Sequence, residues 1–558
     1  MDVALKNAMV LDGSGEPGQI CDVGITGDRI SHVGHVDSSE ARQVYDLSGL
    51  VLAPGFLDIH THYDAQVLWD PDLTPSCWHG VTSVVAGNCG FGLAPTRPEH
   101  RSLIIETLEN VEGMSSAALH QGIQWGFETY EEYRAVLESI PRRLNIGTLV
   151  GHTPIRLYVM GTEAAERPAT PEEVAQMKYL VTSAMSAGAL GFATSRSPVH
   201  MGARGMPIPS RLADHEELKT LVDAVGGAGI VQSTAGPGFF IKEYAEFSKR
   251  WKMPITWTSL LTDRRAAGMD LSGMEEMGLP SARLLEAQSA LGGQVWPQIS
   301  CRPLSTQFTL AQPPATMTML RSFEAILQRP SGERKAVYSD PRWQEQARPE
   351  VMATWSRWAK TTVAETQHHP EVAGLSLEDV ARQWNTTPFD AMITVALADD
   401  LATRFGVVIM NDDEDELGTL LRDKRTLLGL SDAGAHASQL CDAGYATYLL
   451  GHWVRENKAL TLEQAVWRLT AQPASIFRIE SRGLIREDYY ADLVAFDPDT
   501  VGCGDLQRVR DLPANEDRLI APSEGIEYVW VNGSVVRAEA RDVDGAAPGK
   551  MLKSAQAA

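Results

Sequence analysis

Short apolar runs that alternate with longer amphipathic stretches are the feature that most constrains how this chain can fold. Eight such runs recur between residues 55 and 432, and they are rich in β-branched and aliphatic side chains. This alternation is typical of repeated βα units, whose strands form a parallel sheet covered by helices. We therefore expect strands at 55–62, 82–88, 145–152, 188–194, 229–235, 254–261, 294–300 and 426–432.

Capping residues mark several helix starts between these runs. Thr170 stands three residues before Glu173, with a proline between them, and this spacing predicts a capping box. Eight buried strands, each leading to a helix, predict a (β/α)₈ TIM-like barrel over residues 53–481. A doubly wound open sheet is the alternative, but no GxGxxG segment follows the first strand. Two further helix starts are predicted at Asp214 with Glu217 and at Thr461 with Gln464.

The sequence pattern at both ends of the chain differs from that of the βα repeat, because short runs of alternating β-branched residues replace the longer amphipathic stretches. Neither residues 1–52 nor residues 482–540 carry enough apolar surface to be buried alone, so we expect them to form one small β-sandwich. Residues 302–425 interrupt the barrel between its last two strands. Their polar, turn-rich middle predicts a lid-like insertion over the barrel mouth. A weakly ordered tail is expected for residues 541–558.

The composition narrows the class of function. A length of 558 residues exceeds what one hydrophobic core usually supports, so we expect one large domain and a smaller one. The residues are 44% hydrophobic and 22% charged, as in an ordinary soluble globular protein. A formal net charge of −23 disfavours binding to nucleic acid or to an anionic membrane surface. The six cysteines form no CxxC pattern, which favours a reducing compartment. We expect a cytoplasmic protein without a signal peptide or membrane span, with a small-molecule substrate, and leave a homo-oligomer open.

A histidine pair at the end of the first predicted barrel strand is the sharpest local motif. Side chains alternate along a strand, so His60 and His62 should point the same way, toward the C-terminal mouth of the barrel. Two imidazoles that converge on one point can share a divalent metal, with zinc preferred. The alternative is that one histidine packs and the other caps a loop, which this spacing at the end of an apolar strand disfavours.

Two further motifs end predicted strands. Asp432, in Ser-Asp-Ala-Gly-Ala-His, follows the last apolar run, where barrel enzymes keep their catalytic groups. Its carboxylate can bind a metal and take a proton from water, although it could also only cap a turn. Cys89, in Gly-Asn-Cys-Gly-Phe-Gly, ends the second strand, where its thiolate would be a soft metal ligand. A small buried hydrophobic role is the alternative for Cys89.

These motifs together resemble a known family. The sequence is similar to the amidohydrolase superfamily, and within it to the N-acyl-D-amino-acid deacylase (D-aminoacylase) branch. The resemblance covers nearly the whole chain and implies a metal-bearing (β/α)₈ barrel with a small β-sandwich built from both chain ends. It also implies that His60 and His62 bind metal, that Cys89 replaces a carboxylated lysine, and that Asp432 is the catalytic base. The segments that carry it are APGFLDIHTHYD, WHGVTSVVAGNCGFGLAP, VGHTPIRLYVMG, GFATSR and LSDAGAH.

The chain departs from the family pattern at its fifth and sixth strands. The pattern places a metal-binding histidine at the end of each, whereas this sequence reads VQSTAGP and ITWTSLL there. The fourteen histidines offer no obvious substitute. We rank one zinc ion at His60, His62 and Asp432 first, with Cys89 near it, loss of metal second and a metal pair third. The residues that stand in the two segments are Ser233, Thr234, Trp257 and Thr258.

Other polar residues are expected on loops at the mouth. An arginine there can pair with a substrate carboxylate and a histidine can polarise the scissile carbonyl, but Arg156 and Arg196 could equally be surface charges. The acidic run at 411–416 lacks a calcium-loop pattern and predicts a solvated helix start. The candidate substrate-binding residues are Tyr63, His152, Arg156, Arg196 and His436.

Three classes of function follow from these residues. The first is hydrolysis of an amide bond, with Asp432 carrying a proton from water to the leaving nitrogen. The resemblance implies an N-acyl-D-amino acid or a related small amide as its substrate. The second keeps the barrel but opens a cyclic amide or lactone, or cleaves a carbon–carbon bond, which the missing histidines favour. The third, a ligand-binding protein without turnover, is disfavoured because His60, His62 and Asp432 are all present.

Overall fold

Two compact units make up the structure, a computed structural model that describes every residue except 263–273, 315–316, 318–319, 328 and 555–558. The larger unit contains residues 1–302 and 413–558, and the smaller contains residues 303–412. The active-site motifs named above all lie in the larger unit.

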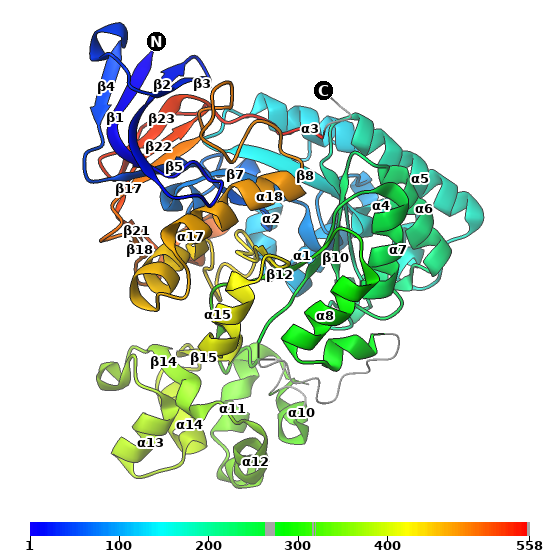
Figure 1. The fold of residues 1–558 in the computed structure, drawn as a ribbon. Coiled ribbons are helices and arrows are strands. Elements are labelled where there is room, and N and C mark those ends of the chain that lie inside the picture. The colour runs from blue at the N-terminus through cyan, green and yellow to red at the C-terminus, as the bar shows by residue number, and fades with distance from the viewer. Residues whose placement is uncertain (263–273, 315–316, 318–319, 328, 555–558) are drawn as a thin grey trace. The chain divides into compact units, whose positions relative to one another are not determined.

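A parallel sheet of eight strands forms the centre of the larger unit (Figure 1). The sheet is closed at its mouth by a parallel bridge between Thr61 and Ala433, where the His62 amide donates to the Ala433 carbonyl at 2.8 Å. Each predicted barrel strand overlaps one of these strands, which confirms the TIM-like barrel. In spatial order they are β6 (Phe56–Asp58), β7 (Val81–Ala86), β8 (Asn145–Gly151), β9 (Gly191–Ser195), β10 (Ile230–Thr234), β11 (Ile255–Thr258), β12 (Val295–Ile299) and β16 (Leu427–Leu428).

The helices around the barrel begin where the capping residues predict. Thr170 and Glu173 form the capping box of α5, Asp214 caps α6, and Thr461 with Gln464 forms the capping box of α17. Each cap satisfies backbone amides that the first turn of a helix leaves without partners. The helices of this unit include α4 (His152–Met160), α5 (Pro171–Ser186), α6 (His215–Val225), α7 (Ile241–Trp251), α8 (Ser281–Leu291), α17 (Leu462–Leu469) and α18 (Ala471–Ile476).

A second sheet, of nine strands, is built from both ends of the chain, which lie side by side in Figure 1 as blue and orange-to-red strands. The two ends meet where β5 pairs antiparallel with β17, with Leu52 opposite Ala495. An apolar cluster that includes Leu5, Ile25 and Trp530 packs on this sheet. Its strands are β1 (Val3–Val10), β2 (Gln19–Thr26), β3 (Arg29–Gly34), β4 (Gln43–Asp46), β5 (Val51–Pro54), β17 (Leu493–Phe496), β22 (Ile526–Val531), β23 (Ser534–Ala538) and β24 (Arg541–Asp542).

Residues 541–554 are packed against the rest of the unit, so the expected weak order of this tail is wrong for the part that the structure describes. The Leu552 amide donates to the Ile146 carbonyl of β8 at 2.8 Å, and the Ile146 amide donates to Lys550 at 3.0 Å. The Leu552 side chain is buried in an apolar cluster with Leu57 and Leu149. The polar and small residues of this segment gave no sign of this pairing, because it depends on β8, which is distant in the sequence.

Residues 303–412 form a unit with a core of its own. The predicted polar middle of this insertion is helical, and Tyr338, Trp343 and Ala347 point into that core. The expectation of a polar, turn-rich segment is therefore wrong, because apolar residues recur among the charges at helical spacing. A role as a lid stays a prediction. The elements are β13 (Leu304–Phe308), α10 (Arg321–Leu327), α11 (Arg334–Tyr338), α12 (Pro341–Thr354), β14 (Thr361–Glu365), α13 (Leu377–Trp384), α14 (Pro388–Ala398) and β15 (Arg404–Met410).

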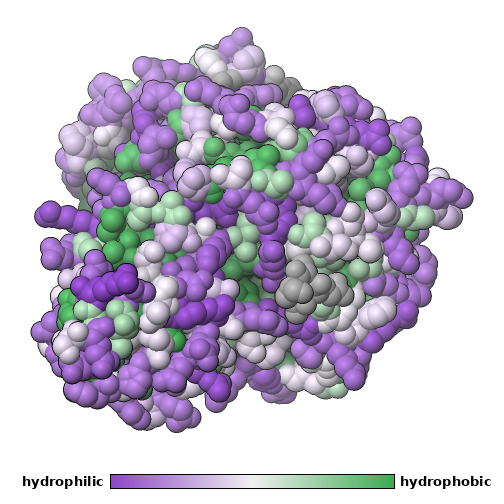
Figure 2. Space-filling view, turned by 90° about the horizontal axis from the view of Figure 1, so that it is seen from above, coloured by the Kyte–Doolittle hydropathy of each residue, from purple (hydrophilic) through white to green (hydrophobic). Residues whose placement is uncertain are grey.

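The face of the molecule in Figure 2 is mainly hydrophilic, as expected for a chain with 22% charged residues. Hydrophobic residues are visible in separate patches between the hydrophilic ones. Asp413 caps α15 (Glu414–Arg422), so the acidic run is the helix start that the sequence predicts. Among the described residues, no helix is both long enough and apolar enough to cross a membrane.

Replacing Leu552 by alanine should test the packing of the C-terminal segment. Loss of its buried side chain should lower the free energy of unfolding by about 2–4 kcal/mol, because a cavity would remain in the apolar cluster that contains Leu57 and Leu149. The measurement is urea or thermal unfolding followed by circular dichroism. Lys553→Ala, an exposed neighbour, is the control and should change stability by less than about 0.5 kcal/mol. Equal stability of wild type and Leu552→Ala would contradict the packing.

Candidate metal centre and active site

Three side chains that could hold a metal ion meet at the mouth of the barrel. One ligand atom from each of His60, His62 and Cys89 lies within 4.8 Å of the other two, and all three residues are buried. His60 and His62 follow β6, and Cys89 follows the neighbouring strand β7. In the part of the chain that the structure describes, no other histidine, cysteine, aspartate and glutamate side chains form such a group. The structure therefore brings together the predicted metal residues of the first two strands.

Glycines allow Cys89 to reach this position. Cys89 itself has a φ of 56°, in the left-handed region, within the short turn after β7. A Cβ atom on Gly90 would lie 2.8 Å from the Cα atom of Thr194 in β9, so a larger residue would collide with the next strand but one. The Cys89 amide donates to Gln232 Oε1 at 2.7 Å. This turn places the thiol beside the histidines, and Cys89 Sγ lies 3.4 Å from His60 Nε2.

Glutamines on the far strands orient the cluster. His60 Nδ1 lies 2.8 Å from Oε1 of Gln298 on β12, while Gln298 Nε2 donates to Thr256 of β11 at 3.1 Å. A hydrogen bond at Nδ1 fixes the ring so that Nε2 faces the cluster, as in many metal sites. Gln298 and Gln232 carry no motif in the sequence, and only their places on the barrel strands could have indicated them.

The Asp432 carboxylate faces both histidines. Its Oδ1 is 3.2 Å from His60 Nε2 and 3.6 Å from His62 Nε2. Burial opposes ionisation of Asp432, but the hydrogen bond from His62 and the charge of His60 outweigh it and hold the pKa well below its usual range. Asp432 also has a φ of 45°, in the left-handed region that aspartate adopts more readily than most residues. These contacts suit a carboxylate that binds or exchanges a proton at the mouth.

The Cys89 thiol is set up to ionise. Burial would raise its pKa, but the charge of His60 and the hydrogen bonds with both histidines lower it to about 6. A thiolate is the form of cysteine that binds metal, so the cluster favours the ligating state.

The strand-five and strand-six positions hold residues that bond to the barrel wall. Tyr244 donates to Ser233 at 2.9 Å, and Trp257 donates to Gln288 at 2.7 Å. Thr258 donates to Thr234 at 3.2 Å. These positions supply no imidazole, as the sequence indicates, and their hydroxyl and indole groups pair within the protein.

One carboxylate at the site was missed by the sequence analysis. Glu112, the last residue of α1 (Arg101–Glu112), places its Oε2 3.5 Å from His62 Nε2 and 3.9 Å from His436 Nε2. Burial raises its pKa to about 8, and the charge of His62 offsets part of that rise. The available signal was its spacing from Ile105 and Leu108, which puts an acid on the apolar face of a helix.

His436 lies next to this cluster, while the other candidate substrate-binding residues do not face it. The His436 amide donates to the Glu112 carbonyl at 2.5 Å, which holds the loop after β16 against the end of α1. His200, also missed, has a pKa lowered to about 3 by burial and by the charges of His436 and His62. Its Nδ1 lies 2.8 Å from Ser195 Oγ at the end of β9.

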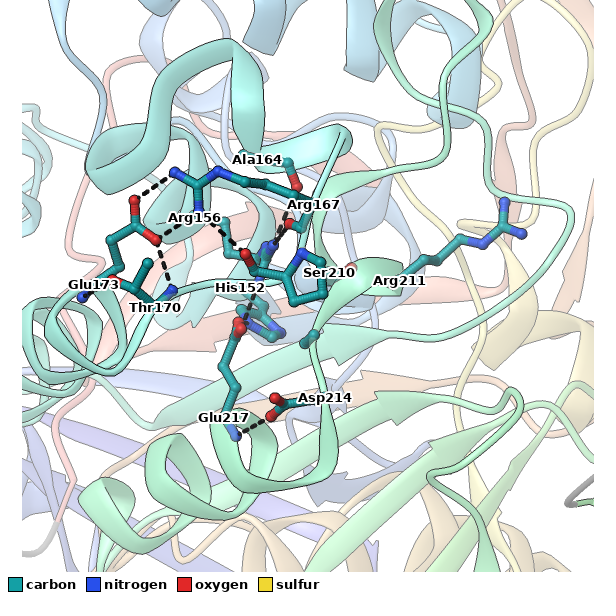
Figure 3. A network of polar contacts seen from close by, with 12 residues as sticks. His152, Arg156, Ala164, Arg167, Thr170, Glu173, Ser210, Arg211, Asp214 and Glu217 are labelled. Atoms are coloured by element: carbon teal, nitrogen blue, oxygen red, sulfur yellow. Dashed lines mark hydrogen bonds and ion pairs between the residues drawn. The ribbon is translucent and has the colours of Figure 1, made fainter.

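His152 and Arg156 belong to a buried network instead of the mouth (Figure 3). His152 Nε2 is 2.8 Å from Glu217 Oε1, and Arg156 pairs with the other oxygen of the same carboxylate. Arg156 also donates to the carbonyls of Ala164 and Arg167 at 3.2 and 2.9 Å. Both side chains are bonded within this network, and substrate binding by them stays a prediction. Helix α4 begins at His152, so both side chains pack against α6 and its Glu217.

Tyr63 and Arg196 also have partners within the protein, and their assignment to substrate binding stays a prediction. The Tyr63 ring lies in the apolar core, and its hydroxyl is 2.7 Å from Ser76 Oγ. The Arg196 guanidinium donates to four backbone carbonyls and so holds the loops after β9 and β10. These carbonyls belong to Ser210, Arg211, Ala213 and Pro237.

Comparisons with known proteins extend these observations. The family model described as "Amidohydrolase family" matches residues 43–537. A D-aminoacylase of Alcaligenes xylosoxydans xylosoxydans is 28% identical over 96% of this chain and 94% of the relative. An N-acyl-D-aspartate deacylase of the same organism is 28% identical over 96% and 92%. A solved D-aminoacylase, described by one-metal activation and second-metal attenuation of its binuclear centre, matches 99% of both chains at 25% identity with a TM-score of 0.65.

Arg156→Ala should test whether the Figure 3 network is structural. Loss of this fully buried arginine leaves the Glu217 carboxylate without its main counter-charge, so the free energy of unfolding should fall by about 3 kcal/mol or more. Arg167→Ala, which breaks half-exposed ion pairs nearby, is the control and should cost at most about 1 kcal/mol. Thermal unfolding measures both. A raised KM with an unchanged Tm for Arg156→Ala would instead restore its role in substrate binding.

Proposed function

Because this chain belongs to the amidohydrolase family, we propose that it is a metal-dependent hydrolase of an amide bond. The observation that carries the proposal is the buried group of His60, His62 and Cys89 with the Asp432 carboxylate beside it. A group of this composition at the C-terminal mouth of a parallel barrel is typical of catalysis and is costly to maintain for stability alone.

The donor atoms fit a zinc ion. In a tetrahedral zinc site with bonds of about 2.0–2.3 Å, two ligand atoms are about 3.3–3.7 Å apart. The pairs His60–Cys89, His60–Asp432 and His62–Asp432 are separated by 3.4, 3.2 and 3.6 Å. A thiolate with two imidazoles is a donor set that zinc prefers. We propose that His60, His62 and Cys89 hold one ion and that Asp432 lies beside it, where the position left for water would be. A bound zinc ion would polarise the scissile carbonyl and make a water molecule more acidic.

Asp432 is the proposed proton carrier. Its low pKa keeps the carboxylate ionised at neutral pH, ready to accept a proton from the attacking water at an Oδ atom. Return of that proton to the leaving nitrogen completes the cleavage of the amide. The closure of the barrel at Thr61 and Ala433 fixes the carboxylate opposite the histidines.

The proposed substrate is an N-acyl-D-amino acid. Support comes from the two relatives described above, which match nearly the full chain and are deacylases of this class by name. A panel of N-acyl-D-amino acids, N-acyl-L-amino acids, lactams and lactones tests the assignment. Turnover of a lactam or lactone but of no N-acyl-amino acid would replace it with ring opening.

We further propose that the protein works in the cytoplasm. All six cysteines are free, and Cys89 must stay reduced to bind metal.

Removing both histidines of the first strand should abolish metal binding. The double variant His60→Ala, His62→Ala loses two imidazole ligands, while the strand itself keeps its apolar core residues. Elemental analysis of purified protein should find zinc in the wild type and none above background in the variant. His120→Ala removes an exposed histidine and should keep full metal content. Equal zinc in wild type and double variant would rule out this site.

Asp432→Asn should separate proton transfer from structure. Asparagine tolerates the left-handed φ and caps a turn as well as aspartate, so the fold should be unchanged. It cannot take up a proton at neutral pH, and kcat should fall by at least about a hundredfold. Steady-state kinetics on the best substrate of the panel, with Tm as the check of folding, measures this. A kcat within a few-fold of wild type would reject the assignment.

A further inference from the structure

Glu112 occupies a position that is electrostatically unfavourable for an acid. The carboxylate ends α1, where the helix dipole places partial negative charge, and the residue is only 4% exposed. No lysine or arginine among the described residues forms an ion pair with it, and the ionisable groups that face it most closely are the rings of His62 and His436. A buried charge is costly unless it is paired or coordinates a metal.

The chain holds this carboxylate in place from both sides. Gly113 ends α1 with a φ of 59°, and a Cβ atom there would lie 2.8 Å from His436 Nδ1. The Glu112 carbonyl accepts the hydrogen bond from the His436 amide, while Leu108 anchors the preceding turn in the core. These contacts end the helix and hold the Glu112 side chain beside His62 and His436.

From this geometry we propose that Glu112 is a further ligand of the metal ion and supplies the donor that β10 and β11 lack. This inference rests on the proposed function and defines its ligand set. The 3.5 Å between Glu112 Oε2 and His62 Nε2 matches the separations among the other donor atoms. Carboxylate oxygen is a normal zinc ligand beside imidazole and thiolate. Gln232 of β10 does not supply this donor, because its side-chain oxygen accepts a hydrogen bond from the Cys89 amide.

The competing role is that Glu112 only orients His62 through a hydrogen bond. Glutamine distinguishes the two roles, because its side-chain oxygen can still accept a hydrogen bond but is a poor ligand. Glu112→Asp adds a second contrast, since it keeps the charge but withdraws the oxygen by one methylene. Glu109→Gln is the matched control, an exposed glutamate on the same helix one turn earlier.

The experiment measures metal binding directly. Metal-free wild type and variants are titrated with Zn²⁺ against a chromophoric chelator, and the visible absorption of the Co²⁺-loaded proteins is recorded. We expect Glu112→Gln and Glu112→Asp to bind Zn²⁺ at least about tenfold more weakly than wild type, equivalent to about 1.4 kcal/mol. The Co²⁺ d–d bands should change because the ligand set changes, while the thiolate charge-transfer band from Cys89 should remain. Glu109→Gln should match wild type.

Two results would overturn the inference in distinguishable ways. If wild type binds Zn²⁺ and Glu112→Gln stays within tenfold of its affinity, or gives the same Co²⁺ spectrum, Glu112 is not a ligand and the proposed function stands. If wild type itself takes up neither ion, the proposed function fails and the inference fails with it. The Tm of each metal-free variant is measured alongside; a variant must keep the wild-type Tm for its loss of affinity to count, and Glu112→Asp replaces Glu112→Gln if only the latter unfolds.

Discussion

Closure of the barrel between its first and last strands is the constraint on which the site depends. The Thr61–Ala433 bridge joins segments from opposite ends of the barrel sequence, and Ser431 donates to the His60 carbonyl at 3.0 Å beside it. These contacts set the Asp432 carboxylate against the two imidazoles. The backbone therefore holds the carboxylate near the imidazoles. Burial of these ionisable groups is unfavourable, and the stability of the whole barrel offsets that cost.

Local pattern was sufficient to predict the barrel and the centre of the site. His60, His62, Cys89 and Asp432 each stand directly after an apolar run, and parallel strands deliver such residues to one end of a barrel. Glu112 could not be predicted in the same way. It lies at the end of a helix, and its direction depends on how that helix docks on the loop after β16. The orienting role of Gln298 is equally invisible without the neighbouring strands.

Several candidate substrate-binding side chains are bonded elsewhere in the fold, and these cases have a common physical cause. A residue that directly follows a barrel strand is expected at the C-terminal end of the barrel. Its position in the sequence does not predict where the side chain points once the backbone turns. At His152 a helix begins immediately, and Arg156 then faces the carboxylate of another helix. Arg196 is taken up by loop carbonyls, which a sequence cannot distinguish from a substrate carboxylate. Charged residues near an active site therefore need their partners in the fold before they are given a role.

The pairing of β5 with β17 has a consequence for how the chain is made. During synthesis the N-terminal strands leave the ribosome first, and β5 keeps an open edge until β17 arrives after the whole barrel sequence. An unpaired edge strand is prone to join another chain, and closing so long a loop carries a large entropic cost. Completion of the barrel shortens that loop, because it brings the two ends of the chain close together. The sheet can therefore be completed only after β17, which follows the barrel in the sequence, has been made.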